Sequence, residues 1–431
     1  VAWFAVHEPY GGPDAYRRFV DAAHGHGLAV VQDVVYNHFG PSGNYLPVFG
    51  PYLADTHTDW GAVVNLDGPD SAEVRRYIAD NVRFWFTDMH VDALRLDAVH
   101  ALVDSSEIHL LEELAVVTAE ASAHLRRPLT LIAESDQNDP RLVTPRQGGG
   151  IGVDAQWSDD FHHALHSVLT GEVDGYYADF GSLATLAATC ERGFYRDGTF
   201  TLADGSTRGH PTDVATLPGW RLVVCYSNHD QIGNRAAGDR PGHLLDDDQL
   251  ASAALLTLTT AYTPMLFQGE EWAASAPFPF FSSHPEPELS DAVTTGRLAE
   301  FDRMNWDLDT VLRPQDPDTN ARARLDWAEP EVGRHATILQ VHRQLIALRR
   351  ELSELTDPAM TGTSCSFDED ARWFLMRRNG LAVVVNFGDA EASVDLGGRH
   401  SLRWATPSGA RLAGTSVVLP PHAGALLLPL A

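Results

Sequence analysis

Short apolar runs that end in a charged or imidazole side chain recur along this chain, and helical segments separate them. Four such endings follow one another in order: Asp33-Val-Val-Tyr-Asn-His38, Arg95-Leu-Asp-Ala-Val-His100, Ile132-Ala-Glu-Ser135 and Ser227-Asn-His-Asp230. Strands that stop at a polar tip and lead through a loop into a helix build the C-terminal face of a (β/α)8 barrel. The pattern therefore predicts a parallel sheet that carries functional groups at the carboxyl ends of its strands.

The spacing of apolar residues predicts where the strands and helices of this sheet lie. Near-continuous apolar runs favour buried parallel strands, and apolar residues at helical spacing favour covering helices. We expect strands over 28–35, 91–96, 129–133, 151–157, 222–226 and 264–268, and helices over 14–27, 71–89, 108–125 and 336–352. The chain begins Val1-Ala-Trp-Phe, without a methionine and as if at the end of a strand. We therefore expect an N-terminal truncation that removes the first barrel strand.

Beyond about Thr361 the pattern changes to short alternating strands separated by turn residues. The clearest of these are 373–376, 381–387, 393–396 and 423–428. Such spacing is typical of a small antiparallel sandwich. The expected fold class is thus α/β: an N-terminally truncated (β/α)8 TIM barrel at residues 1–355, followed by a C-terminal antiparallel β-sandwich domain at residues 356–431.

The charge balance excludes several classes of partner. The chain has 59 Asp and Glu residues against 31 basic residues, which gives a formal net charge of −28. Nucleic acids and anionic membranes bind through dense positive charge, so we expect neither as a partner. A neutral polyhydroxy ligand is indifferent to this sign, although a solubilising acidic surface explains the composition equally well.

Residue usage narrows the chemistry further. The chain has no lysine, which excludes Schiff-base and lysine-dependent phosphoryl-transfer chemistry. Cys190, Cys225 and Cys365 are scattered, so neither a disulfide framework nor a zinc spacing emerges. No run reaches the roughly 18 apolar residues of a membrane span. We expect a cytoplasmic protein without a membrane partner.

Two of the strand endings supply a pair of carboxyl groups with different surroundings. Asp97 follows Arg95 by two positions in a strand, so both side chains point to one face. A guanidinium keeps a neighbouring carboxylate ionised, as a nucleophile must be. Glu134 ends a run without other charges, and crowding by a second carboxylate is expected to raise its pKa so that it can donate a proton. The alternatives are a structural ion pair at Asp97 and an exposed loop glutamate at Glu134.

The fourth ending adds a further carboxylate and an imidazole. Asp230 and His229 are suited to hydrogen bonds with sugar hydroxyl groups, and His38 and His100 can act in the same way, although a single histidine is more often structural. Paired carboxylates about one bond are what glycoside hydrolysis requires. The residues by themselves therefore predict a sugar-cleaving enzyme.

These four endings resemble the four signature regions of the α-amylase superfamily of glycoside hydrolases and transglycosylases. Asn37-His38 matches the first region, Arg95 and Asp97 the second, Glu134 the third, and His229-Asp230 the fourth; residues 263–270 resemble the eighth-strand signature. The resemblance implies that Asp97 is the nucleophile, Glu134 the general acid/base and Asp230 the transition-state stabiliser. It also implies that His38, Arg95 and His229 hold the sugar in the cleavage subsite.

Other segments resemble one family within that superfamily, the maltooligosyltrehalose trehalohydrolases. They are residues 7–13, 39–45, 157–165, 228–235, 268–281 and 296–301. This resemblance implies retaining hydrolysis of the α-1,4 bond next to the terminal trehalose of maltooligosyl trehalose, with release of trehalose. It implies related α-glucans as ligands and a maltooligosyltrehalose synthase as the pathway partner. A glycogen branching enzyme is the alternative within this class, and a non-catalytic saccharide-binding protein is the alternative outside it.

Two further segments are candidates for contact with the sugar. We expect substrate-binding residues after the sixth strand and elsewhere on the catalytic face: Tyr10, His100, Asp159, Asp160, Phe161, His162, His163, Gln231 and Asn234. For the segment 159–163 the alternative is a helix start whose acids lie in the first turn. The aromatic run from Trp272 through Phe281 is suited to wall a pocket for trehalose, and its alternative is a packing patch over the barrel rim.

The resemblance also bears on metals. In calcium-dependent amylases an Asn of the first region ligates the ion, and Asn37 occupies that place. Because the trehalohydrolase branch does not generally depend on that calcium, we predict no obligatory metal and no cofactor.

Overall fold

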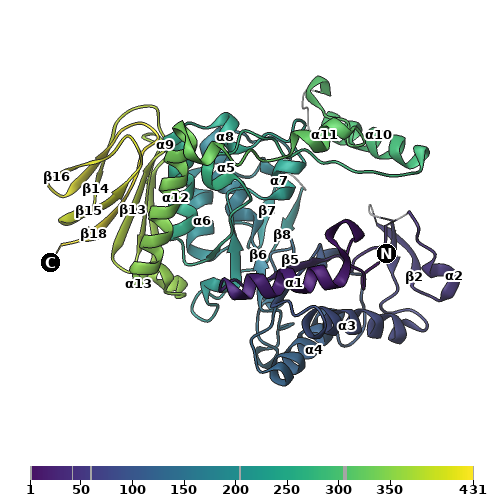
Figure 1. Cartoon of the computed structure of the whole chain (residues 1–431). Helices are drawn as coiled ribbons and strands as arrows, with labels where there is room; N and C mark the ends of the chain where they lie inside the picture. The colour runs from purple at the N-terminus through teal and green to yellow at the C-terminus, as the bar shows by residue number, and fades with distance from the viewer. Residues whose placement is uncertain (1, 41, 59–60, 203–204, 304–307, 431) are drawn as a thin grey trace. The chain divides into compact units, whose positions relative to one another are not determined.

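The chain folds as two compact units, Val1–Ser158 and Asp159–Ala431 (Figure 1). The computed structural model describes residues 2–40, 42–58, 61–202, 205–303 and 308–430. Across these ranges no helix is both long enough and apolar enough to cross a bilayer.

The first unit is built on four parallel strands. In sheet order these are β1 (Val31–Val34), β4 (Ala93–Leu96), β5 (Thr130–Glu134) and β6 (Ala155–Trp157). The register pairs Asp33 with Arg95 and Glu134 with Trp157, so polar and aromatic side chains meet at the carboxyl ends. The remaining elements are α1 (Gly12–Gly25), α2 (Leu46–Phe49), the hairpin β2 (Leu53–Thr58) and β3 (Gly61–Val64), α3 (Ser71–Thr87), α4 (Leu110–Leu125), and the 3-10 turns η1 (Glu8–Tyr10), η2 (Val99–Ala101), η3 (Pro140–Leu142) and η4 (Arg146–Gly148).

Helix–sheet packing holds this unit together. β4 is buried at all four positions, and α3 buries Ile78, Val82 and Phe86 in the same core. Completely burying a side chain of this size contributes about 1.5–3 kcal/mol to stability. The packed core therefore fixes the backbone at the carboxyl ends of the strands, where the polar residues lie.

The second unit begins with the helices and strands that continue the β/α alternation. β9 (Leu222–Val224) and β10 (Thr263–Pro264) pair in parallel. The helices are α5 (Asp159–Thr170), α6 (Leu183–Arg192), α7 (His229–Gly233), α8 (Pro241–Leu244), α9 (Asp247–Thr259), α10 (Pro287–Arg303), α11 (Pro317–Arg322), α12 (Gly333–Glu351) and α13 (Ser353–Thr356). A short hairpin, β7 (Thr199–Thr201) and β8 (Ser206–Arg208), and the turns η5 (Gly175–Tyr177), η6 (Gly219–Arg221), η7 (Glu270–Trp272), η8 (Leu308–Thr310), η9 (Glu329–Glu331) and η10 (Met360–Gly362) complete this part.

The C-terminal part of the second unit is an antiparallel sandwich. One sheet has the order β11-β12-β13-β18-β15 and the other β14-β17-β16. The strands are β11 (Thr363–Asp368), β12 (Trp373–Arg378), β13 (Leu381–Asn386), β14 (Ala392–Asp395), β15 (His400–Ala405), β16 (Arg411–Ala413), β17 (Ser416–Leu419) and β18 (Gly424–Pro429). In Figure 1 these yellow strands lie beside the long green helix α12. A hydrogen bond of 2.9 Å from Trp404 Nε1 to Gln344 Oε1 joins β15 to that helix.

The expected element types are confirmed, and several boundaries are shorter than expected. The predicted strand 151–157 narrows to β6, because the backbone N–H groups of Ile151 and Val153 donate to the carbonyls of Arg141 and Leu142 instead. The expected strand end at residues 1–4 is wrong for the part that is described: residues 3 and 4 form a turn, and Val1 lies outside the described residues. Both hairpins, β2–β3 and β7–β8, and the strands β11, β15, β16 and β17 were not predicted. The boundary between residues 355 and 356 lies within α13, and the division into domains there stays a proposal.

Candidate active site

One buried cation lies against three carboxylates at the strand ends of the first unit. Arg95 is 3% exposed, and its Nη1 donates to Asp33 Oδ2 at 2.9 Å and to Asp97 Oδ1 at 2.8 Å. Its Nη2 lies 2.8 Å from Glu134 Oε2. Burial disfavours the charged guanidinium, but the carboxylates outweigh this effect and raise the pKa of Arg95 above its ordinary value. Arg95 therefore remains a cation that holds all three acids in place.

An aromatic ring supports this cation from the neighbouring strand. The guanidinium carbon of Arg95 lies 4.3 Å from the ring centroid of Trp157, at the end of β6. A cation over an indole face gains electrostatic attraction and loses rotational freedom. Neither Trp157 nor Asp33 was singled out in the sequence, because their roles follow from the register of neighbouring strands rather than from local spacing.

Asp97 is held on its second oxygen by the amide of Asn37. Asn37 Nδ2 donates to Asp97 Oδ2 and to the Asp97 carbonyl, each at 2.9 Å, while Asp97 Oδ1 receives Arg95. Two donors on one carboxylate fix its plane. The side chain is 27% exposed, so one edge remains open to a ligand.

Glu134 is positioned by a backbone group that points in an uncommon direction. Ala98 has a φ of +39°, in the left-handed region that a residue with a Cβ seldom adopts. This conformation aims the Ala98 N–H at Glu134 Oε2, at 2.7 Å. Together with Arg95 this contact stabilises negative charge on Oε2, and the proton that we expect on Glu134 stays a prediction.

The histidines of the first unit differ in their surroundings. His38 Nδ1 hydrogen-bonds Asn37 Oδ1; burial lowers the pKa of His38, and the nearby carboxylate of Asp97 offsets only part of this. His38 is therefore a neutral imidazole at pH 7, suited to hydroxyl contacts. His100 lies in η2, with Nδ1 3.7 Å from Asp136 Oδ1, and stays a predicted sugar contact. Both polar atoms of the Asn37 side chain are engaged within the protein, to Asp97 and to His38.

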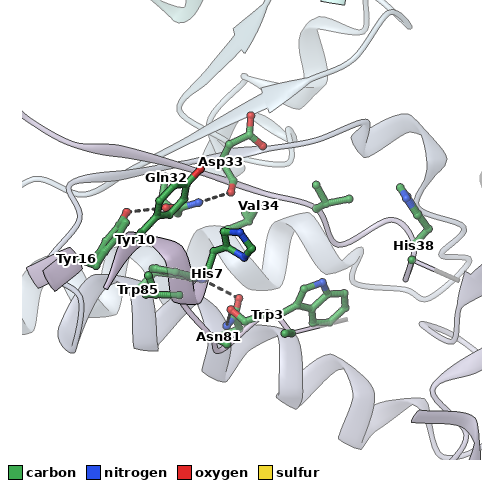
Figure 2. Close-up of a pocket in the computed structure, with 15 residues that line it drawn as sticks. Trp3, His7, Tyr10, Tyr16, Gln32, Asp33, Val34, His38, Asn81 and Trp85 are labelled. Carbon is green, nitrogen blue, oxygen red and sulfur yellow. Dashed lines mark hydrogen bonds between the residues drawn. The ribbon is translucent and has the colours of Figure 1, made fainter. Parts of the chain in front are cut away.

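A cavity of about 480 Å³ lies beside β1 in the first unit (Figure 2). Figure 2 shows Tyr10, at the end of η1, and His7, which precedes that turn. Their ring centroids lie 5.4 Å apart in edge contact. Trp3, Asp33 and His38 also line the cavity. Two polar residues from the region where β1 ends, Asp33 and His38, are therefore accessible from it. Its size falls within the roughly 300–1,000 Å³ of small-molecule pockets. Tyr10, which is 72% exposed, stays a predicted substrate contact.

In the second unit a short helix presents Asp230. Asn228 caps α7 by accepting from the backbone N–H groups of Asp230 (2.8 Å) and Gln231 (3.1 Å). Asn234, one turn further, donates from Nδ2 to Asp230 Oδ1 at 3.2 Å. These contacts fix the carboxylate at the start of the helix, where the helix dipole favours negative charge.

A second cavity, of about 130 Å³, opens at this helix. Its walls are His163, Tyr176, Asp230, Gln231 and Asn234. Three of the predicted binding residues thus share one cavity with the predicted transition-state stabiliser. Tyr176, on η5, was not predicted, since nothing in its local sequence distinguishes it from a core tyrosine.

The segment 159–163 requires a correction. We expected Phe161 to offer its ring to a sugar, but Phe161 is 0% exposed and packs in the apolar core. Asp160 is 3% exposed and accepts from the backbone N–H groups of Tyr195 and Arg196 at 2.9 and 2.8 Å. These two side chains are therefore structural, because α5 is buried on nearly every side. The alternative interpretation, a helix start with acids in its first turn, is the correct one for Asp160.

The two histidines of that segment also differ. His162 is 2% exposed and bonds the Tyr226 carbonyl (2.8 Å) and the Tyr177 hydroxyl (3.0 Å), which contradicts a direct sugar contact. His163 lines the smaller cavity, and burial, followed by the charges of Arg196 and His166, lowers the pKa of His163 to about 3. A neutral His163 stays a predicted contact, as does Asp159, whose Oδ1 lies 3.4 Å from Gln231 Nε2.

The aromatic run after β10 divides into a buried and an exposed part. Trp272 is 3% exposed and packs on Trp327, with ring centroids 5.2 Å apart, which is the packing role that we considered as the alternative. Phe280 and Phe281 are 38% and 39% exposed. Arg297 lies 4.1 Å from the centroid of the Phe280 ring and also donates to Asn234 Oδ1 at 2.8 Å. The exposed phenylalanines are thus connected through Arg297 to the residues around Asp230.

A buried acid behind Ser227 was not predicted. Glu270, in η7, is 4% exposed, and Ser227 Oγ donates to Glu270 Oε2 at 2.5 Å. Burial raises the pKa of Glu270 to about 8, although the bond from Ser227 opposes this shift. The sequence marks Glu270 only as part of the Gln-Gly-Glu-Glu run, and its burial follows from tertiary packing.

A β/α alternation whose strand ends carry an arginine-held aspartate and glutamate defines a class of protein, the α-amylase type of glycoside hydrolase. In agreement, the chain superposes on a putative alpha amylase from Salmonella typhimurium with a TM-score of 0.87 and 33% identity, over 99% of this chain and 72% of that one. Residues 358–426 match a family described as a domain of unknown function (DUF3459).

Sequence relatives narrow the class. A malto-oligosyltrehalose trehalohydrolase of Rhizobium sp. (strain M-11) is 53% identical over 428 residues, 99% of this chain and 72% of that protein. Another, of Arthrobacter ramosus, is 58% identical over 386 residues, 89% of this chain and 66% of that protein. The chain belongs to the malto-oligosyltrehalose trehalohydrolase family.

Proposed function

We propose that this chain hydrolyses the α-1,4-glucosidic bond next to the terminal trehalose of maltooligosyl trehalose and releases trehalose. The observation that carries the proposal is the buried guanidinium of Arg95, which contacts both Asp97 and Glu134. It holds two carboxyl groups at neighbouring strand ends, and a pair of carboxyl groups about one bond is what glycoside hydrolysis uses. Family membership supplies the identity of the substrate.

In the proposed reaction Asp97 attacks the anomeric carbon of the sugar on the donor side of the bond. The bond to the trehalose oxygen breaks as Glu134 gives that oxygen its proton, and a glycosyl–Asp97 ester forms. Water then attacks the same carbon, Glu134 takes a proton from the water, and the ester bond to Asp97 breaks. Two displacements retain the α configuration, so we expect Asp97 and Glu134 to lie roughly 5–5.5 Å apart, rather than the roughly 6.5–9.5 Å of an inverting pair.

We assign supporting roles to the remaining predicted residues. Asp230 stabilises positive charge on the sugar ring in the transition state, while His38, Arg95 and His229 hold the sugar at the cleavage point. The remaining proposed contacts are Tyr10, His100, Asp159, His163, Gln231 and Asn234. We further propose that Phe280 and Phe281 wall the compact trehalose leaving group, because both rings are more than a third exposed.

We also propose the domain boundaries, the pathway partner and the cellular location of this enzyme. We place the catalytic barrel at residues 1–355 and the C-terminal sandwich at 356–431. A maltooligosyltrehalose synthase supplies the substrate, related α-glucans bind more weakly, and the reaction takes place in the cytoplasm. The net charge of −28 disfavours nucleic acid and anionic membranes as partners.

The test compares two substrates. The chain is incubated with maltooligosyl trehalose and, separately, with amylose, and the products are separated by chromatography. Trehalose release far faster than amylose cleavage supports the proposal. New α-1,6 branches in amylose would instead indicate a branching enzyme, and binding of glucan without turnover would indicate a saccharide-binding protein. Asp97→Asn is the control, because it removes the nucleophile and should abolish release.

A further inference from the structure

The C-terminal sandwich carries a groove outside the residues assigned to catalysis. It has a volume of about 520 Å³, and two segments line it, residues 370–373 and 387–393. We call it the sandwich groove. Because β12 and β13 are antiparallel neighbours with Trp373 opposite Asn386, the two segments meet at one end of the sheet. The groove lies within residues 358–426, the segment that matches a domain of unknown function.

Two aromatic rings, those of Trp373 and Phe387, line the groove. Trp373 packs against the core of the sandwich and Phe387 against the core shared with the helices, and both remain half-buried. A half-buried ring has one side fixed by packing and another side in contact with whatever enters the groove. Such rings favour flat ligands with apolar C–H faces.

The rim of the groove is polar and acidic. Asp370, Asp389 and Ser393 are exposed, and Glu391 pairs with Arg411 at 3.0 Å. Phosphates and other anions are disfavoured beside these carboxylates, whereas neutral hydroxyl groups can donate to them. Apolar faces combined with many hydroxyl groups are the chemistry of a pyranose ring.

Arg372 lines the groove, and its guanidinium is hydrogen-bonded to other parts of the protein. Arg372 directs Nη2 at the Val168 carbonyl, at 3.1 Å, and so anchors the sandwich to α5. It has a φ of +55°, which turns its own carbonyl toward the Phe387 N–H at 2.8 Å. The guanidinium is therefore a structural part of the groove wall.

A buried amide holds the second segment in shape. Asn386 is 0% exposed; its Oδ1 accepts from the Gly388 N–H at 3.0 Å, and its Nδ2 donates to the Ala390 carbonyl at 2.8 Å. His422 Nε2 lies 3.1 Å from Asp389 Oδ1 and steadies that side chain. A groove whose walls are fixed before binding loses little entropy when a ligand enters.

We propose that the sandwich groove is a glucan-binding site, which holds a stretch of glucosyl units of an α-glucan chain apart from the bond that is cleaved. The identity of the sugar rests on the proposed function, and the groove itself rests on Trp373, Phe387 and the acidic rim. Such a site retains long glucan chains on the protein. Binding one part of a chain in the groove raises the effective concentration of the rest of that chain at the cleavage site.

The test uses two groove variants and a matched control. Trp373→Ala removes one stacking face, and Ser393→Ile adds bulk to an exposed position of β14, where a β-branched residue suits the strand. Trp220→Ala is the control, because Trp220 is also exposed (43%) but lines no part of the groove. Retardation of each protein in native gels that contain amylopectin measures binding without turnover.

We expect both groove variants to bind amylopectin about tenfold more weakly, and the control to bind as the parent chain does. Turnover of the shortest trehalose-capped substrate should be unchanged, while KM for long-chain substrates should rise. Unaltered retardation of Ser393→Ile, in a protein with an unchanged circular dichroism spectrum, would overturn the inference. If retardation falls in the groove variants while the parent chain releases no trehalose from any substrate, the groove stands and the proposed function fails.

Discussion

Ser227 Oγ donates a 2.5 Å hydrogen bond to Glu270 Oε2, and Glu270 is only 4% exposed. Ser227 precedes Asn228, the residue whose side chain caps the helix that carries Asp230. The buried acid thus lies directly behind the loop that presents a predicted catalytic carboxylate. Its protonation state affects the stability of this region.

Glu270→Gln is expected to stabilise the protein near neutral pH. Burial raises the pKa of Glu270 to about 8, while the unfolded chain has the ordinary value of about 4.5. Between these values the unfolded state binds fewer protons than the folded state, so stability falls as pH rises from 4.5 to 8. An uncharged amide removes this loss and keeps an acceptor for Ser227. We predict a gain of up to about 4 kcal/mol in the free energy of unfolding at pH 7.5, and almost none at pH 4.5.

Urea unfolding of both proteins at the two pH values checks this prediction. A gain that is equal at pH 4.5 and 7.5 would show that packing, rather than ionisation, distinguishes the two side chains. A loss of stability at both values would contradict the buried protonated acid altogether. Glu271→Gln serves as the neighbouring control.

Arg95→Lys should nearly abolish turnover while leaving the protein folded. A lysine keeps the charge but lacks the planar fork that reaches Asp33, Asp97 and Glu134 at once. We expect kcat to fall by about 100-fold or more, comparable to the loss of one preorganised charge contact in other active sites. Steady-state kinetics on maltooligosyl trehalose measure the effect, and a kcat within a factor of three of the parent value would contradict it.

Asn37→Ala should lower kcat more than it changes KM. The amide holds Asp97 Oδ2 at 2.9 Å, and a hydrogen bond to a charged group contributes about 1.5–3 kcal/mol. Without it Asp97 can rotate away from the attack geometry, so we expect a loss of about tenfold to 100-fold in kcat. Asn44→Ala is the matched control, because Asn44 Oδ1 accepts a 3.2 Å bond from the Leu46 N–H in the turn that begins α2. Equal losses in the two variants would remove the assigned role.

His422→Asn should weaken the protein mainly at acidic pH. His422 Nδ1 lies 2.6 Å from Asp246 Oδ2 and Nε2 3.1 Å from Asp389 Oδ1. Burial lowers the pKa of His422, but the bonds to Asp246 and Asp389 outweigh it, so the pKa lies above the ordinary 6.5. The stabilisation is therefore complete below pH 6.5 and is lost as pH rises through the folded-state value.

Because Asp246 and Asp389 are themselves exposed, solvent screening limits this effect to about 1 kcal/mol or less. Asparagine suits the position, where φ is +60°. Thermal unfolding at pH 5.5 and pH 9 gives the answer: the variant should be less stable only at pH 5.5. A deficit that persists at pH 9 means that the charge of His422 is not its source.

The local sequence was sufficient to predict the residues that end a strand. Asp97 and Glu134 were predicted because an apolar run stops at each, and the spacing of Arg95 and Asp97 placed both on one face. Asp33 and Trp157 were missed because their contacts with Arg95 depend on the register of β1 and β6, which local spacing does not specify. The left-handed backbone conformation of Ala98 could not be predicted either, since alanine seldom adopts it.

The incorrect assignments share a physical cause. Phe161 and His162 follow a strand end, which suggested the catalytic face, but helix α5 begins at Asp159 and turns both side chains into the protein. The three-residue strands of the hairpin β7–β8 offered too short a pattern to detect. Tertiary packing decides these positions, and a single sequence contains little of that information.

The anomeric form of the first product distinguishes a retaining from an inverting reaction. Proton NMR during the first turnovers of maltooligosyl trehalose separates the α- and β-anomeric signals of the new reducing end before mutarotation mixes them. We expect trehalose together with the α-anomer, because Asp97 and Glu134 catalyse two successive displacements. Initial formation of the β-anomer would contradict Asp97 as a nucleophile and the whole retaining mechanism.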